Sequence, residues 1–329
     1  IDRSRGLGDV YKRQISMRKI NYLFAVLTLL TFNQCEKQKS SVLENRWSEE
    51  RAWEWQEKNG WMVGTNFNPS TSINQLEFWQ EDTYDSITID RELKWSSELG
   101  MNLHRVYLHN LLWDQDSLGF LDRIEDYLKI SDSYNIKTLL VLLDDVWHPI
   151  PKLGKQPEPI PYVHNSGWVQ APGSEILGDS LRHNELKNYI KGVISHFAND
   201  NRVIGWDLYN EPDNVAPAYP RFPDRPNDIK DKKIYTLSLL KKVIYWSREI
   251  NPSQPLTVGL WKDPETWGSL DNLSPIDKFA LSNSDVISFH AYDNINETRK
   301  KIEALEIYNR PLLCTCLLYT SDAADDRVS

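Results

Sequence analysis

A carboxylate preceded by a side-chain amide ends one apolar run of the chain, in the stretch Gly205-Trp206-Asp207-Leu208-Tyr209-Asn210-Glu211-Pro212. Residues 203–209 have the β-rich composition of a strand, so Asn210 and Glu211 are expected at its carboxyl end. A carboxyl group there can donate a proton near neutral pH if partial desolvation raises its pKa. Glu211 is therefore the leading candidate for a general acid/base, and we predict a raised pKa for it.

Two other β-rich runs carry polar side chains that could support such an acid. In residues 102–107, Arg105 is predicted to point into the protein interior, where an unpaired guanidinium is costly and needs a carboxylate. In residues 285–290 and just beyond, His290 and Tyr292 are two positions apart and therefore share one face of a strand. We expect both to face the active-site mouth with Glu211.

Asp144 and Asp145 follow a third run, residues 138–143. Carboxylates at the end of a strand can bind sugar hydroxyls, ligate a cation or cap the following loop. All three roles stay open, and polar support of the site is the interpretation we favour.

These side chains need a scaffold that brings strand ends together, and the chain alternates short β-rich runs with amphipathic stretches. That alternation is typical of βα units and a parallel sheet. Apolar residues recur at helical spacing in the stretches between, as in Phe120, Ile124 and Tyr127. The predicted strands are residues 62–66, 102–107, 138–143, 203–209, 256–260, 285–290 and 311–315.

Seven such units predict an α/β fold of the TIM (β/α)8 barrel type, incomplete because about seven βα units are present. The long connections 146–179 and 213–227 both follow strands, whereas the returns from helix to strand are short. In a barrel this asymmetry marks the carboxyl-terminal face, where the active site is built.

The fourth strand with its Asn-Glu-Pro resembles the large barrel clan of glycoside hydrolases, which includes the cellulase-type family five and the β-mannanases. The resemblance covers about residues 61–315. It implies that Glu211 is the acid/base, that Asn210 binds the sugar 2-hydroxyl, and that Arg105 braces the nucleophile. It also implies that His290 contacts substrate or acid/base and that Tyr292 donates to the nucleophile. For Arg105, the alternative role is an ion pair with another barrel residue. For His290, the alternative is a purely structural role.

The resemblance requires a nucleophilic glutamate at the end of the seventh strand, because double displacement with retention needs a second carboxylate. Cys316 stands at that position. Residues 1–14 and 316–329 resemble translated sequencing-adapter sequence, so we interpret the glutamate as lost by truncation. A redox or metal pair of Cys314 and Cys316 is disfavoured, since two thiols at this spacing on a strand make neither.

Aromatic side chains on the predicted loops could stack on sugar rings, although core packing explains abundant tryptophan equally well. The net charge of -9 and the lack of clustered Lys and Arg argue against nucleic acid as a partner and leave a neutral ligand. The candidate platforms are Trp113, Trp147, Trp168, Trp261, Tyr162 and Tyr219. The segment Gly167-Trp168-Val169-Gln170-Ala171-Pro172-Gly173 resembles loop sequence of mannanase-like members.

The amino-terminal region reads as an export signal. Basic residues precede a short apolar run, and Cys35 follows it directly, which resembles a bacterial lipoprotein signal over residues 17–35. Gln34 stands where a small residue is usual, so ordinary secretion is the alternative. The predicted order is leader 1–14, signal 17–35, linker or amino-terminal segment 36–55, truncated barrel 56–315 and tail 316–329.

The sequence thus predicts an exported, lipid-anchored O-glycosyl hydrolase that acts on β-linked mannan, glucan or xylan without cofactor or metal. It is expected to be inactive for lack of the nucleophile. The alternative is a non-catalytic surface glycan-binding protein on a degenerate barrel. The sequence does not identify the sugar, endo or exo action, or an oligomeric state.

Overall fold

The structure is a computed structural model that describes residues 45–215 and 228–317. The leader, the signal with Cys35, Tyr219 and the tail beyond Leu317 lie outside the described residues. The chain divides into two units, Ile1–Asn45 and Arg46–Ser329, and every described helix and strand belongs to the second. None of the helices in the described ranges has the length and apolar character needed to cross a bilayer.

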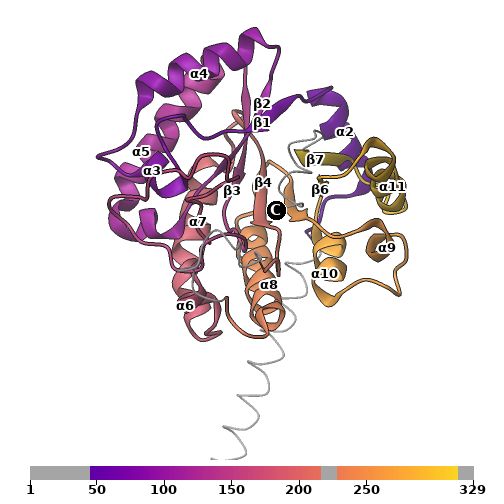
Figure 1. Ribbon diagram of the computed structural model, residues 1–329. Coiled ribbons are helices and arrows are strands. Elements are labelled where there is room, and N and C mark those ends of the chain that lie inside the picture. The colour runs from indigo at the N-terminus through magenta and orange to yellow at the C-terminus, as the bar shows by residue number, and fades with distance from the viewer. Residues whose placement is uncertain (1–44, 216–227, 318–329) are drawn as a thin grey trace, which may run out of the picture. The chain divides into compact units, whose positions relative to one another are not determined.

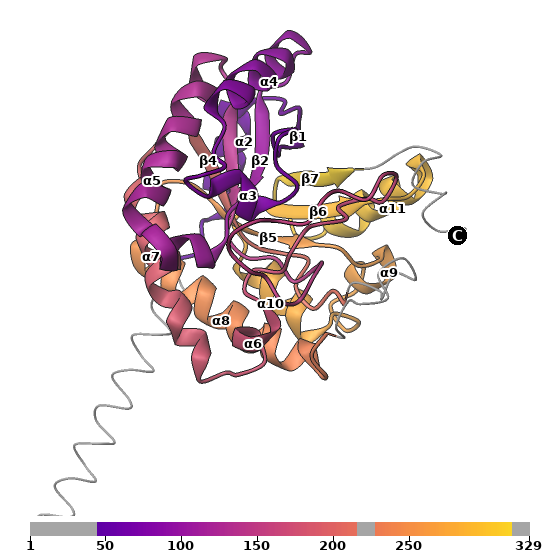
Figure 2. The same cartoon turned by 60° about the vertical axis from the view of Figure 1, so that its left-hand side comes forward.

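Seven parallel strands of the described residues form one sheet in the order of the sequence. Each strand pairs with the next, and Figures 1 and 2 show the helices outside them. The first and last strands meet where Asn66 Nδ2 donates to Thr315 O at 3.0 Å. The prediction of an incomplete TIM barrel with seven βα units is confirmed. The strands are β1 Gly64–Asn66, β2 Leu103–Tyr107, β3 Lys137–Val141, β4 Val203–Asn210, β5 Leu256–Leu260, β6 Ile287–Ala291 and β7 Leu312–Leu317.

Helices connect the strands, as parallel pairing requires. The predicted apolar faces are buried, including Phe120, Ile124 and Tyr127. Asp116 interrupts one long helix with non-helical angles and accepts from the Gly119 N–H, so it caps the second part. The helices are α2 Glu49–Asn59, α3 Gln75–Trp79, α4 Ser86–Glu98, α5 Asn110–Ser133, α6 Ser174–Leu177, α7 Lys187–Phe197, α8 Lys232–Ile250, α9 Pro264–Trp267, α10 Pro275–Asn283 and α11 Ile295–Glu306, with the 3-10 helix η1 Arg182–Leu186.

Strand boundaries differ from the predicted ones by at most two residues, and β5 has the predicted bounds. β1 begins at Gly64 and is exposed along its length, as expected of a strand with one paired edge. β6 begins at Ile287, so Asp285, predicted to be its first residue, lies before the strand and carries a buried carboxylate. That carboxylate accepts from the Trp47 and Leu256 N–H groups and pairs with Arg248.

Helix α2 covers the amino-terminal ends of strands and begins inside residues 36–55, which were predicted to be a linker or amino-terminal segment. Trp55 Nε1 donates to Ile204 O at the start of β4, at 3.2 Å. Trp47 and Ala52 pack with Val286, just before β6, in one apolar cluster. This end of the barrel is therefore closed by structural contacts, and the candidate site lies at the carboxyl ends of the strands.

Candidate active site

The carboxyl ends of five strands bring the predicted polar residues together. Arg105 lies on β2, Asn210 ends β4, and Glu211 follows it directly. His290 is on β6 and Cys316 on β7, and these two are paired in register. Asp144, just after β3, forms a bridge with Asn210. The Asn-Glu pair of the sequence is therefore surrounded by side chains from across the barrel.

Glu211 is 7% exposed and has a φ of +44°, in the left-handed region. Its N–H donates to Gly259 O at 3.0 Å, which fixes the strained backbone against β5. One carboxyl oxygen, Oε1, lies 2.5 Å from Nδ1 of His290. The other, Oε2, accepts a hydrogen bond from Nδ2 of Asn214 at 2.5 Å. Both oxygens of the candidate acid thus have fixed partners.

The predicted rise in the pKa of Glu211 is wrong in this structure. Burial does raise the pKa, but the hydrogen bond and charge of His290, with Asn214 and Arg105, outweigh it and lower the pKa below its ordinary value. Donors stabilise the carboxylate form more than burial destabilises it. Among the described residues these donors prevail, and a second negative charge nearby would favour the protonated acid.

Asn210 has its amide orientation fixed on both sides. Its Oδ1 accepts from Nη2 of Arg105 at 2.8 Å and from the Tyr107 hydroxyl at 3.1 Å. Its Nδ2 donates to Oδ1 of Asp144 at 2.9 Å. The amide oxygen is thereby occupied, so contact with a sugar hydroxyl falls to the remaining N–H of the amide.

Arg105 forms the ion pair that was the alternative interpretation. Nη2 lies 2.7 Å from Oδ2 of Asp207 on β4, and Nε lies 3.0 Å from the same oxygen. Nη1 also donates to the Tyr107 hydroxyl and to Asn66 Oδ1. The carboxylate that this buried guanidinium needs is therefore supplied by the acid/base strand. The predicted role of Arg105 in bracing the nucleophile at position 316 stays a prediction.

Position 316 faces Tyr292, as the predicted nucleophile position should. The Tyr292 hydroxyl lies 2.6 Å from Sγ of Cys316, and Asn66 Nδ2 lies 3.6 Å from the same sulfur. Burial raises the pKa of the Cys316 thiol, so the group is neutral rather than a thiolate. Cys314 is likewise a free thiol, with a pKa that burial raises to about 11.

The two adjacent aspartates have different surroundings. Asp144 Oδ1 accepts from Asn210 and from the Val146 N–H, while Oδ2 has no hydrogen-bond partner among the described residues. Burial raises the pKa of Asp144 to about 8. Asp145 accepts from the hydroxyls of Tyr209 and Thr236 at 2.6 Å each. Asp144 therefore belongs to the site, and Asp145 anchors the structure beneath it.

Three predicted aromatic platforms lie near these residues. Trp168 packs edge-on against Tyr107 of β2, with ring centroids 4.8 Å apart, and contacts Trp147 at 6.3 Å. Trp261 donates its indole N–H to Pro212 O at 3.0 Å, directly beside Glu211. All three are partly buried, which leaves part of each ring accessible.

Two other aromatic candidates lie away from the site or fully in solvent. Trp113 on α5 packs on Gly192 of α7, which favours the alternative of plain packing for this side chain. Tyr162 is 97% exposed and has no packed support.

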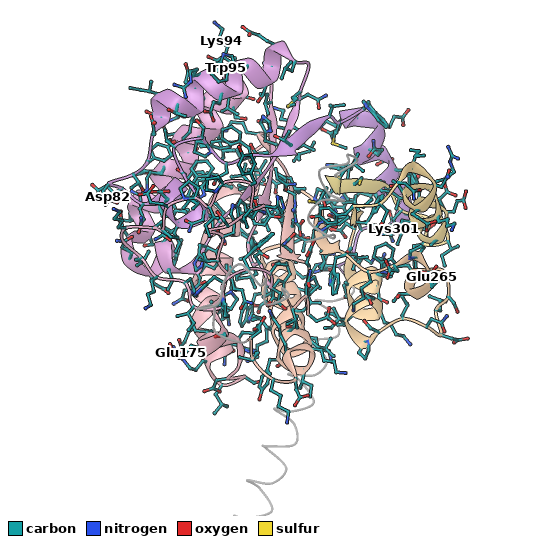
Figure 3. All side chains as sticks on the ribbon, in the orientation of Figure 1. Asp82, Lys94, Trp95, Glu175, Glu265 and Lys301 are labelled. Atoms are coloured by element: carbon teal, nitrogen blue, oxygen red, sulfur yellow. The ribbon has the colours of Figure 1, made fainter. Side chains whose placement is uncertain are left out.

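Several residues that shape the site were missed by the sequence reasoning. Gly259 on β5 leaves room for the site, because a Cβ there would lie 3.2 Å from both Arg105 Nη2 and His290 Nε2. A glycine inside a strand is a sequence signal for such close approach. Asn214 and Lys232 were also missed, because nothing in their spacing from Glu211 indicates contact. Lys301 on α11, labelled in Figure 3, donates to His290 O at 3.3 Å and supports the end of β6.

Within residues 45–215 and 228–317, no three His, Cys, Asp or Glu side chains gather as a set of metal ligands. Most polar groups of the site are instead used in the hydrogen bonds described above, whereas Oδ2 of Asp144 and Nε2 of His290 have no hydrogen-bond partner among the described residues. The functional groups at the site that could take part in a reaction are carboxyl, imidazole, amide and hydroxyl groups.

No protein-family model and no curated protein matches the chain. Among solved structures, the β-mannanase of the blue mussel Mytilus edulis is similar, with a TM-score of 0.48, 12% identity and coverage of 81% of this chain and 91% of that one. The endo-1,4-β-mannanase of Eisenia fetida has a TM-score of 0.46 at 10% identity, covering 78% and 83%. The endo-β-1,4-mannanase of Thermotoga petrophila has a TM-score of 0.48 at 12% identity, covering 78% of this chain and 61% of its own.

Proposed function

We propose that this chain is a retaining β-glycoside hydrolase of the cellulase and β-mannanase type, with Glu211 as the acid/base. The observation that carries the proposal is the contact of the Glu211 carboxyl with His290 across the barrel mouth, at 2.5 Å. A carboxyl group at the carboxyl end of a barrel strand, held by fixed donors, has the place and surroundings of a catalytic acid/base.

Retention requires a second carboxylate about 5 Å from the first. Position 316 suits it, because Tyr292 lies against that side chain and the charge of Glu211 is close enough to help raise the pKa of the Cys316 thiol. We expect a glutamate there in the active protein. Its negative charge would raise the pKa of Glu211, since like charges disfavour ionisation, and would restore the proton that the acid needs.

The reaction then follows from the two carboxyl groups. The carboxylate at position 316 bonds to the anomeric carbon while the Glu211 proton moves to the departing glycosidic oxygen. Water then adds to the anomeric carbon as Glu211 takes its proton and the carboxylate leaves. Two inversions give net retention, and the double displacement uses no cofactor.

The experiment installs the missing carboxylate. We expect Cys316→Glu to release phenol from aryl β-mannosides, β-glucosides or β-xylosides, whereas the chain with Cys316 does not. Cys314→Glu, the same change two residues earlier on β7, is the matched control and should stay inactive. Near-ultraviolet circular dichroism verifies that each variant is folded. A folded Cys316→Glu variant that hydrolyses none of the glycosides would contradict the proposal.

A glycan-binding protein without catalysis is the second candidate, and the thiol at position 316 is the observation that favours it. Resequencing the gene past Thr315 separates the two. A glutamate directly after Thr315, followed by about 60 residues that include an eighth strand, supports the enzyme. Binding of oligosaccharides by the folded chain without turnover, together with a genuine Cys316, supports the binding protein.

The place of the protein in the cell is a separate part of the proposal. A basic, apolar and cysteine-ended segment before the barrel supports export with lipid attachment at Cys35. Growth of a bacterial host with an alkyne-labelled fatty acid should label the protein, and Cys35→Ser should abolish the label. Label that is unchanged in Cys35→Ser would contradict anchoring at this residue.

A further inference from the structure

The carboxyl group of Glu211 is held by two donors, and only one of them belongs to the predicted set. His290 contacts Oε1, and Asn214 donates from Nδ2 to Oε2 at 2.5 Å. Asn214 lies three residues beyond Glu211, in the loop after β4. It is therefore a contact to the acid that no resemblance and no spacing predicted.

A tight turn brings Asn214 back onto the acid. Its own N–H donates to Glu211 O at 3.0 Å, and Asp213 within the turn has a φ of +65°. The Asp213 N–H donates to Oδ2 of Asp145 at 2.7 Å, which fixes the turn to the end of β3. The amide of Asn214 is thus aimed at Glu211 by the backbone itself.

A buried lysine holds the other side of the turn. Nζ of Lys232 donates to Asn214 O at 3.1 Å and to Asp145 O. Its side chain is only 2% exposed, and it pairs with Asp228 Oδ2 at 2.6 Å. Asp228 also accepts from Nε2 of Gln170 at 2.8 Å. These partners satisfy the buried ammonium of Lys232. The lysine is therefore fixed within the protein, and it fixes the carbonyl of Asn214 in turn.

The chemical consequence concerns which oxygen of Glu211 carries the proton. An amide N–H can only donate, so Oε2 is an acceptor and Oε1 is left to hold the proton. We propose that Asn214 is a positioning residue that holds Oε2 of Glu211 as an acceptor and leaves the acid proton on Oε1, beside His290. The catalytic use of that proton rests on the proposed function, but the hydrogen bond does not.

Asn214 also sets the pH at which Glu211 is protonated, since a hydrogen bond to the charged form stabilises that form. Charged or titratable groups face Glu211 from four strands, and their effects persist when Asn214 is changed. They are Arg105 from β2, Asp144 after β3, His290 and Tyr292 at the end of β6, and Cys316 from β7.

The test is a titration of Glu211 by carboxyl carbon-13 nuclear magnetic resonance in the full chain with labelled glutamate. The signal is assigned by its loss in Glu211→Gln. We expect Asn214→Ala to move the midpoint up by about 1 pH unit. Asn214→Asp has nearly the same shape but replaces the donor with a carboxylate, so it should move the midpoint further up. Asn283→Ala, which removes a similar amide bond at the end of α10, should leave the midpoint unchanged.

Equal midpoints in the wild type, Asn214→Ala and Asn214→Asp would overturn the proposal. If Asn214→Ala fails to fold, Asn214→Leu takes its place, because it removes the donor without adding a charge. A merely structural asparagine would leave the midpoint of Glu211 unchanged in that variant. The titration needs no glycan and no turnover. A shifted midpoint in a protein that never hydrolyses glycosides would therefore contradict the proposed function while the role of Asn214 stands.

Discussion

The guanidinium of Arg105 on β2 pairs with the carboxylate of Asp207 on β4, with Nη2 2.7 Å from Oδ2. Both side chains are almost completely buried, at 3% and 0% exposure. The same Nη2 donates to Asn210 Oδ1, so the pair orients the amide that precedes Glu211. A charge pair inside the barrel therefore fixes the strand that carries the candidate acid.

Asp207→Asn should destabilise the protein by about 3–5 kcal/mol, because it leaves Arg105 buried without a counter-charge. Urea unfolding followed by circular dichroism measures the free energy of unfolding. The control is Glu297→Gln, which breaks the exposed pair with Lys300 and should cost about 0–1 kcal/mol. A loss below about 1 kcal/mol in Asp207→Asn would show that the buried pair is not required.

Gly259→Ala tests the close approach beneath the site. The added Cβ would lie 3.2 Å from Arg105 Nη2 and His290 Nε2, so one of them must move, at a cost of about 1–3 kcal/mol. Gly268→Ala is the matched control, since its nearest neighbour would be 3.4 Å away. Thermal unfolding compares the two, and equal melting temperatures would exclude crowding at Gly259.

Asp144→Asn should change how stability depends on pH. Burial raises the pKa of Asp144 from 3.8 to about 8, so the folded protein keeps a proton that the unfolded chain loses above about pH 4. Stability from this group is present below pH 4 and is lost as pH rises towards 8, at about 1.4 kcal/mol per pH unit. The amide that replaces the carboxyl group cannot titrate, so this downward slope should disappear from unfolding measurements between pH 5 and 8. An unchanged slope would mean that Asp144 ionises normally.

The fold could be predicted because its signals are local. Alternating β-rich and amphipathic stretches are enough to predict a parallel barrel, and the apolar face of Phe120, Ile124 and Tyr127 is buried as expected. Strand ends were less predictable. Asp285, predicted within β6, lies before that strand and contacts the Trp47 N–H and Arg248 of α8, and no local pattern reports such tertiary contacts.

Site residues could be predicted where a short sequence motif identifies them. Properties that depend on contacts between distant residues could not be predicted. Asn210, Glu211 and His290 could be identified from the ends of their strands. The pKa of Glu211 could not, because it depends on donors from β6 and from the turn at Asn214. The partner of Arg105 was also open, since Asp207 is separated from it by 102 residues.

Trp168→Ala should weaken binding of manno-, cello- or xylohexaose by about tenfold, equal to about 1.4 kcal/mol, if its ring is a sugar platform. Isothermal titration calorimetry measures the affinity. The control is Trp95→Ala, because Trp95 is 52% exposed on the outer helix α4, where Figure 3 labels it. Equal affinities of the two variants would assign Trp168 to packing alone.

The leaving-group dependence of hydrolysis tests most directly whether Glu211 is the proton donor. In the Cys316→Glu protein, Glu211→Gln should reduce hydrolysis of alkyl β-glycosides by about 100-fold or more, because their leaving oxygen needs a proton. Formation of the glycosyl-enzyme from a dinitrophenyl β-glycoside, followed as the burst of phenolate, should change little, because that leaving group departs without one. Equal losses on both substrates would remove Glu211 from the acid role.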